Sequence, residues 1–180
     1  MPRRHTVHRP FLPQCWLMTD ERMGDDLWPA LERLPRGAGV IFRHYSLPKA
    51  ARRAMFERVA AIARRRGLVL VRAGDERLGR GEAGIHGRIN KRAAGLRSWP
   101  AHNRREVMAG VRAGADIILI SPVFATRSHP GARPLGRVRA LITVAGVKVP
   151  IIALGGIDQS HQRWLLSAGF YGWAGIDAWR

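Results

Sequence analysis

The chain has 180 residues, 46% of them hydrophobic, which suits one globular domain with a sizeable core. Its apolar runs fall short of the roughly 20 residues of a membrane helix, and its basic N-terminus lacks the apolar core of a secretory signal, so neither a membrane protein nor a secreted one is expected. Cys15 is the single cysteine, which excludes an intrachain disulfide and suits a reducing cytoplasm.

The chain has a formal net charge of +18, and all but three of its 31 basic residues are arginines. This charge has two interpretations. One is an anionic partner, either nucleic acid or a phosphorylated metabolite. The other is a compositional bias towards arginine, as in a GC-rich genome. We favour this second interpretation for most of the arginines, because they are spread along the chain. Basic and aromatic residues are not interleaved in the way that stacks bases, so a nucleic-acid partner is not expected.

Strand-like and helix-like patterns alternate in the first part of the chain. Residues 1–14 are expected to form an N-terminal arm, and apolar runs predict strands over 15–20, 39–45 and 68–71. Asp25 is expected to cap a helix with the apolar stripe Leu27, Leu31 and Leu34. A second helix, between Pro48 and Gly67, has an apolar stripe made of Ala51, Met55, Val59 and Ile62.

The middle of the chain is rich in glycine and predicts only short strands near 83–86 and 95–99. Asn103 and Glu106 then form a capping-box pattern that opens a helix, followed by a strand over 115–120. A helix over 135–145 is expected to turn four residues inward: Val138, Leu141, Ile142 and Ala145. After a strand over 149–156, Ser160 is expected to cap the last helix, and 171–176 is the eighth strand.

Eight strands, most followed by a helix, predict an α/β fold: one (β/α)₈ TIM barrel over residues 15–180. The chain is shorter than the roughly 200 residues usual for that fold, so the helices around the third to fifth strands are expected to be reduced. An open doubly wound sheet is the structural alternative.

The loop after the sixth strand, SPVFATRSHPGARPLG, carries the strongest functional signal. In a parallel barrel, ligands bind at the carboxyl ends of the strands, where this loop and the diglycine Gly155–Gly156 would meet. Thr126 and Ser128 offer hydroxyl donors, and Arg127 offers a bidentate fork to an anion. Prolines in the loop restrict its conformations. The pattern therefore predicts an anion site, and specifically a site for a phosphate ester.

Metal and triad chemistry are not indicated by the histidines. The sequence lacks HxH and CxxC pairs, so no zinc site is expected. His44, His86 and His102 are interpreted as hydrogen-bonded residues that line a site or stabilise the fold.

Several motifs in order resemble the thiamine phosphate synthase and thiazole tautomerase superfamily: LMTDER, GVIFRH, AGIH, SPVFATRSHPGARPLG, VPIIALGGI and GFYGWAGIDA. The SHPG and AGI motifs are especially similar to the synthase-like module fused behind Nudix hydrolase domains in some bacteria. The resemblance implies a TIM barrel that joins hydroxymethylpyrimidine diphosphate to a thiazole phosphate and releases pyrophosphate.

The resemblance also implies roles for individual residues. Thr126, Arg127 and Ser128 would hold the thiazole phosphate, with an N–H group from the Gly155–Gly156 turn. His129 stands where the family has a lysine that touches the pyrophosphate, and Arg43 matches an arginine of the family's second strand. Three further residues would line the site: His102, Ile176 and Asp177.

The magnesium side departs from the family pattern. The family's Asn-Asp pair after the third strand falls on Arg72-Ala73, which leaves Asp75 as the nearby candidate ligand for Mg²⁺. Arg43, Arg72 and Arg88 are expected to lie near this side and could replace the metal. Asp177 stands in place of a serine and should repel a phosphate unless Arg127 neutralises it.

Two functions follow from these expectations. The first is a thiamine-phosphate-synthase-like transferase of the cytoplasm with a degenerate magnesium site and a small phosphorylated substrate. The second is a barrel without catalytic activity that binds thiazole phosphate or thiamine phosphate. Barrels of this kind often self-associate, so a homo-oligomer is also an open expectation.

Overall fold

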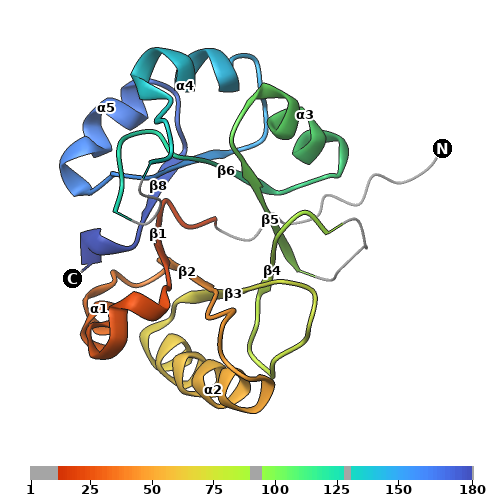
Figure 1. Ribbon diagram of the computed structural model, residues 1–180, viewed down its shortest axis with the longest axis vertical. Coiled ribbons are helices and arrows are strands. Elements are labelled where there is room, and N and C mark those ends of the chain that lie inside the picture. Colours follow the sequence, from red (N-terminus) through yellow and green to blue (C-terminus); the bar gives the residue numbers. More distant parts are fainter. Residues whose placement is uncertain (1–11, 90–94, 128–130, 180) are drawn as a thin grey trace.

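The computed structural model describes residues 12–89, 95–127 and 131–179 and shows a closed barrel of eight parallel strands (Figure 1). Each strand pairs with the next one along the chain, and the eighth pairs with the first. The strands are β1 (Cys15–Met18), β2 (Gly39–Phe42), β3 (Val69–Ala73), β4 (Gly84–His86), β5 (Leu96–Ala101), β6 (Ile117–Ile120), β7 (Ile151–Leu154) and β8 (Gly172–Gly175).

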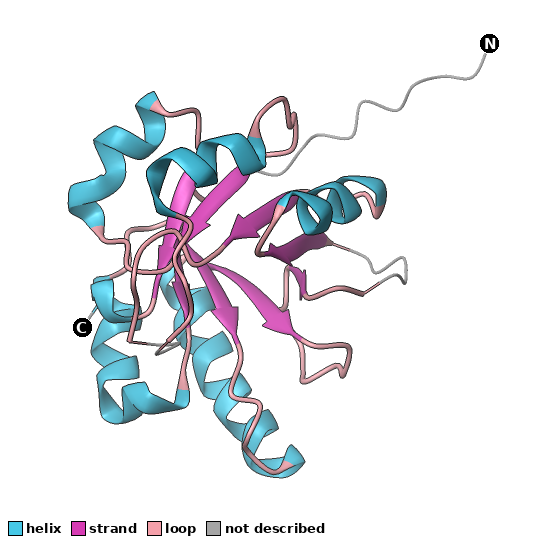
Figure 2. Ribbon diagram, turned by 45° about the horizontal axis from the view of Figure 1, so that its top comes forward, coloured by secondary structure: helices cyan, strands magenta, loops and turns pink. Residues whose placement is uncertain are grey.

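The helices surround the barrel on its outer side (Figure 2). They are α1 (Leu27–Arg33), α2 (Lys49–Arg66), α3 (Arg104–Arg112), α4 (Gly136–Val144) and α5 (Gln162–Ser167), with the 3₁₀ turns η1 (Glu21–Asp26), η2 (Gln159–His161) and η3 (Asp177–Trp179). The described parts of the connections after β3 and β4 contain no helix, and η3 is the one helical turn described after β8. The predicted TIM barrel with reduced helices around the third to fifth strands is therefore confirmed.

The strands read as continuous apolar runs because helices or loops cover their outer faces. β2 and β6, with the sequences GVIF and IILI, are buried at every position. Trp16 of β1 is fully buried, and it lies so close to Gly39 that a Cβ atom there would come within 2.0 Å of the indole ring. A glycine is thus required at the start of β2 for the two strands to approach.

Two of the predicted helix caps are wrong. α1 follows Asp26, whose side chain makes no cap hydrogen bond, and Asp25 lies within η1, the turn that Asp20 caps by accepting a hydrogen bond from the backbone N–H of Arg22. α5 follows His161, which makes no side-chain cap hydrogen bond either, and Ser160 lies within η2, the turn that Asp158 caps by accepting from the N–H of Ser160 at 2.9 Å. In both places a carboxylate ahead of the turn accepts the bond, a role that Asp and Ser share. Asn103 caps α3 as predicted, and the N–H of Glu106 donates to it at 3.0 Å.

The predicted inward faces of two helices also need correction. Val138 and Ile142 of α4 are 70% and 67% exposed, whereas Ala140 and Thr143 are buried. Ala145 is exposed as well, whereas Leu141, the fourth of the predicted residues, is partly buried and packs against the core. In α2 Val59 is buried and Met55 and Ile62 pack against the core as predicted, but Ala51 is exposed and the buried apolar residues also include Phe56, Ala60 and Ala63.

Residues 1–11 of the predicted N-terminal arm lie outside the described residues. Among the helices that the structure describes, none combines the length and the apolar character needed to cross a membrane.

Candidate functional site

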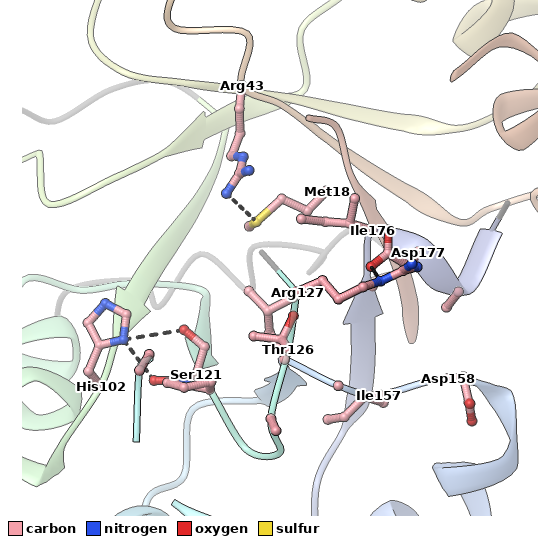
Figure 3. Close-up of a pocket in the computed structure, with 18 residues that line it drawn as sticks. Met18, Arg43, His102, Ser121, Thr126, Arg127, Ile157, Asp158, Ile176 and Asp177 are labelled. Carbon is pink, nitrogen blue, oxygen red and sulfur yellow. Dashed lines mark hydrogen bonds and ion pairs between the residues drawn. The ribbon is translucent and has the colours of Figure 1, made fainter. Parts of the chain in front are cut away.

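A cavity of about 400 Å³ opens at the mouth of the barrel, where the strands have their carboxyl ends (Figure 3). This is the end at which enzymes of this fold bind their ligands. From the loops after β6 and β7 its wall includes Thr126, Arg127, Gly155 and Gly156. From the other strands it includes Arg43, His102, Ile176 and Asp177. The described residues of the predicted site therefore come together in one cavity.

The loop after β6 lies against the end of β7 because the two continue to pair beyond the strands. The N–H of Val123 donates to the carbonyl of Leu154 at 2.9 Å, and that of Phe124 donates to Gly155 at 3.0 Å. Two further backbone bonds, from Leu135 and Gly136, close the other end of the loop onto Pro122 and Val123. This pairing carries Thr126 and Arg127 to the edge of the diglycine.

The diglycine is required by both its conformation and its surroundings. Gly155 and Gly156 have φ angles of +97° and +60°, which favour glycine. A Cβ atom on Gly156 would lie 2.3 Å from the carbonyl oxygen of Ala125, and one on Gly155 would lie 2.8 Å from Pro122. The two loops are thus in contact through glycine backbone, and both glycines line the cavity.

Hydrogen-bond donors suited to an oxyanion gather on this side of the cavity. Thr126 supplies a hydroxyl group and Arg127 a guanidinium, next to the backbone of Gly155 and Gly156. Arg127 also forms an ion pair with Asp177, in which Nε and Oδ2 are 3.3 Å apart. The predicted neutralisation of the Asp177 carboxylate by Arg127 is therefore present. We call the set formed by Thr126, Arg127, Gly155, Gly156 and Asp177 the anion cradle.

Arg43 lines the opposite side of the cavity, where its side chain points inward from the end of β2 (Figure 3). Its guanidinium donates to the carbonyl of Thr19 at 3.0 Å, contacts the Met18 sulfur at 3.4 Å and pairs with the Asp20 carboxylate. Burial opposes the ionisation of Asp20, but the hydrogen bonds from Arg22 and the charges of Arg43 and Arg22 lower its pKa overall. Asp20 is thus an ionised carboxylate that fixes the orientation of both arginines.

The predicted cluster of arginines on the magnesium side is not assembled. Arg72 pairs with Glu82, with 2.6 Å between Nε and Oε2, and Arg88 pairs with Glu106; neither arginine lines the cavity. Of the three arginines, Arg43 alone reaches the cavity, because carboxylates on neighbouring segments hold the other two.

The described residues do not fit a magnesium site. Ala73 ends β3 where a carboxylate would be needed, and Asp75 is exposed and absent from the cavity wall. Within the ranges that the structure describes, no three side chains of the His, Cys, Asp or Glu types are grouped so that they could hold a metal ion. Mg²⁺ prefers carboxylate and other oxygen ligands, and here those near the cavity are engaged by arginines or by a helix cap.

The three predicted histidines are all hydrogen-bonded, and the first, His44, is buried with its Nδ1 3.0 Å from the Thr19 hydroxyl. His102 lines the cavity, and its Nδ1 lies 2.7 Å from the carbonyl oxygen of Ser121. His86 is buried at the end of β4, and its Nδ1 lies 2.8 Å from the Ser98 hydroxyl. Burial lowers the pKa of His86 to about 4, with a smaller contribution from the charge of Arg43, so this imidazole is neutral at pH 7.

Two predicted residues, Ser128 and His129, lie outside the described part of the chain. Other residues were missed by the sequence reasoning, among them Met18 and Asp158 of the cavity wall and Asp20 beside it. Each follows or ends a strand, so a search of the carboxyl ends of β1 and β7 would have found them.

The C-terminal part of the chain matches a known protein family. A family model described as thiamine monophosphate synthase matches residues 98–179. A putative thiamine-phosphate synthase 2 from Aquifex aeolicus is 37% identical over 78 residues, which is 43% of this chain and 42% of that protein. A putative thiamine-phosphate synthase from Geobacter sulfurreducens is 31% identical over 114 residues, or 61% of this chain and 54% of that protein.

The fold matches over a longer range. Thiamine phosphate pyrophosphorylase from Pyrococcus furiosus superposes with a TM-score of 0.77 at 21% identity, covering 93% of this chain and 86% of that one. The sequence matches, in contrast, span only 42% and 54% of the two curated relatives. These matches confirm the resemblance predicted from the motifs, and the part with sequence similarity is the part that carries the anion cradle.

Proposed function

We propose that this chain, a member of the thiamine phosphate synthase superfamily, is a transferase that joins hydroxymethylpyrimidine diphosphate to a thiazole phosphate. One observation carries the proposal: backbone pairing of the β6 loop with the end of β7 places Thr126 and Arg127 beside Gly155–Gly156 at the mouth of the barrel. The sequence similarity to named synthases covers this same region.

In the proposed reaction the anion cradle holds the phosphate of the thiazole. Thr126 and Arg127 would donate to the phosphate oxygens, as would backbone N–H groups of the diglycine, because all of these line one side of the cavity. Ile176 would close the pocket beside them. Ser128, assigned to the same phosphate, and His129, assigned to the leaving pyrophosphate, are proposed from the family resemblance.

The bond-forming step joins the thiazole nitrogen to the pyrimidine methylene carbon as the bond from that carbon to the diphosphate oxygen breaks. The pyrophosphate leaves with the bonding electron pair, so negative charge grows on it and a nearby cation accelerates the step. Arg43 is the cation on the side of the cavity opposite the cradle, and Asp20 and the carbonyl of Thr19 fix its orientation. We assign to Arg43 the stabilisation of the leaving group, and His102 also lines the cavity.

The proposal is tested with the folded chain and both substrates, with product detected by mass spectrometry. Formation of thiamine phosphate is expected, and it should persist when a chelator removes divalent ions, since the described residues do not fit a magnesium site. The absence of product under both conditions, together with a thermal shift caused by thiazole phosphate alone, would instead identify a binding protein without catalytic activity.

Cellular location and oligomeric state belong to the same proposal. A small-molecule transferase with one free cysteine suits the cytoplasm, which fractionation of the native host would test. Self-association is predicted by the resemblance, and light scattering of the purified chain would measure it.

A further inference from the structure

The anion cradle contains a carboxylate of its own. Asp177 is the first residue of η3, two positions after the end of β8, and its side chain is 27% exposed at the cavity wall. Its Oδ2 lies 3.3 Å from Nε of Arg127, and Figure 3 shows the two side chains in contact. A negatively charged group of the protein thus already contacts the guanidinium that would bind a phosphate.

The ion pair between Arg127 and Asp177 is open to solvent on one side, because the Arg127 side chain is 76% exposed. Water screens such a pair, so it is weak and another anion can replace the carboxylate. A phosphate dianion in the cradle would take the guanidinium over from Asp177, and it would then stand beside the Asp177 carboxylate. Like charges at this distance repel, which lowers the affinity for phosphate.

Arg22 extends the same arrangement across the mouth. Its Nη1 donates to the carbonyl of Arg127 at 3.3 Å, and its Nε pairs with Asp20 at 2.7 Å. The hydrogen bond that Arg22 donates to Asp20 raises the pKa of Arg22, and the charge of Asp177 contributes to the same effect. Since Asp20 also pairs with Arg43, positive and negative groups alternate around the mouth. Each of these three arginines thus already has a carboxylate partner, with which an entering anion must compete.

We infer that Asp177 is a specificity-determining residue that competes with phosphate for Arg127. It lowers the affinity of the cradle for phosphate esters and leaves the affinity for uncharged alcohols unchanged, so the difference between the two affinities becomes smaller. A hydroxyl group at the same place keeps the ion pair intact and can donate to the carboxylate, whereas a phosphate must displace it. This inference rests on the proposed function for the thiazole, but the competition itself concerns any phosphate that enters the cradle.

The test measures binding to the whole chain by titration calorimetry with three probes: inorganic phosphate, thiazole phosphate and the thiazole alcohol. Asp177→Asn keeps the shape of the side chain and removes its charge. It should raise the affinity for both phosphates by about tenfold or more and leave that for the alcohol within about twofold. The gain should shrink as salt is added, because ions screen the repulsion.

Two controls separate this effect from a change in net charge or in folding. Asp25→Asn removes one carboxylate that is exposed on η1 and absent from the cavity wall, and it should leave all three affinities unchanged. In an Arg127→Met background, Asp177→Asn should gain much less, because the guanidinium for which the two anions compete is gone. If Asp177→Asn unfolds, Asp177→Ser tests the same point.

The inference is overturned if Asp177→Asn binds phosphate no more tightly than the parent, or if its gain is equal in the Arg127→Met background. Failure of the proposed function looks different: neither chain would bind thiazole phosphate, while inorganic phosphate would still bind more tightly to Asp177→Asn than to the parent.

Discussion

Replacing Gly156 with alanine is expected to separate the two loops of the anion cradle. The new Cβ atom would lie 2.3 Å from the carbonyl oxygen of Ala125 and 2.8 Å from Cβ of Phe124. Both neighbours belong to the loop that backbone bonds hold to the end of β7, so neither can move without breaking that pairing. The φ angle of +60° adds the strain of a left-handed conformation.

The expected cost has two parts. A left-handed alanine costs roughly 1–2 kcal/mol, and a forced displacement in a packed region typically costs about 1–3 kcal/mol more. Gly156→Ala should therefore lower the free energy of unfolding by about 2–5 kcal/mol. Gly146→Ala is a matched control, because Gly146 has a φ of +71° but a Cβ atom there would meet nothing within 4 Å. Gly146→Ala should therefore lose only the roughly 1–2 kcal/mol that a left-handed alanine costs.

Urea denaturation of the three chains measures these losses, and calorimetric titration with inorganic phosphate measures the cradle. Gly156→Ala should lose phosphate binding even under conditions where it is folded, and Gly146→Ala should keep it. Equal losses of stability in the two variants, or parental phosphate affinity in Gly156→Ala, would refute the reasoning that close contact between the loops builds the cradle.

Three further predictions concern other parts of the barrel. Arg43→Met should lower turnover at least about tenfold while leaving the affinity for thiazole phosphate unchanged, in initial-rate and titration assays; the opposite pattern would contradict its place in the diphosphate half. Asn103→Ala should cost about 1 kcal/mol in urea unfolding, because the N–H of Glu106 loses its acceptor, and no loss would contradict the cap. The pKa of His86 is about 4 in the folded chain and near 6.5 when unfolded, so the unfolded state binds more protons between these values. Stability should then fall by up to about 3 kcal/mol as the pH drops from 6.5 to 4, and a pH series in which His86→Asn shows the same fall would contradict this.

The order of elements could be predicted from the sequence because parallel strands leave a strong signal. The run ADIILI predicts a buried strand. The diglycine after IIAL predicts the end of β7. Which face of a helix turns inward is a weaker signal. In α4 the expectation favoured Val138 and Ile142, yet Ala140 and Thr143 are buried, because the distance of closest approach to the barrel decides the packing and hydrophobicity does not.

The site divides in a similar way. Thr126 and Gly156 could be paired in advance because strand order alone brings the ends of β6 and β7 together. The ion pairs could not be predicted from the sequence. Arg72 was expected at the cavity, but Glu82, ten positions further along the chain, holds it elsewhere. A long arginine side chain can reach several carboxylates, and only the three-dimensional arrangement selects one of them.

The balance of charge at the cavity bears on the meaning of the +18 net charge. Among the described residues of the wall, Arg43 and Arg127 stand against Asp158 and Asp177, so the arginines and aspartates there cancel although the chain is strongly basic. An anion that enters must therefore gain its affinity from directed donors, the guanidinium of Arg127 and the glycine backbone, and much less from the overall field. The excess arginines lie elsewhere on the chain, which agrees with compositional bias as their main origin and leaves the discrimination between ligands to the few groups of the cradle.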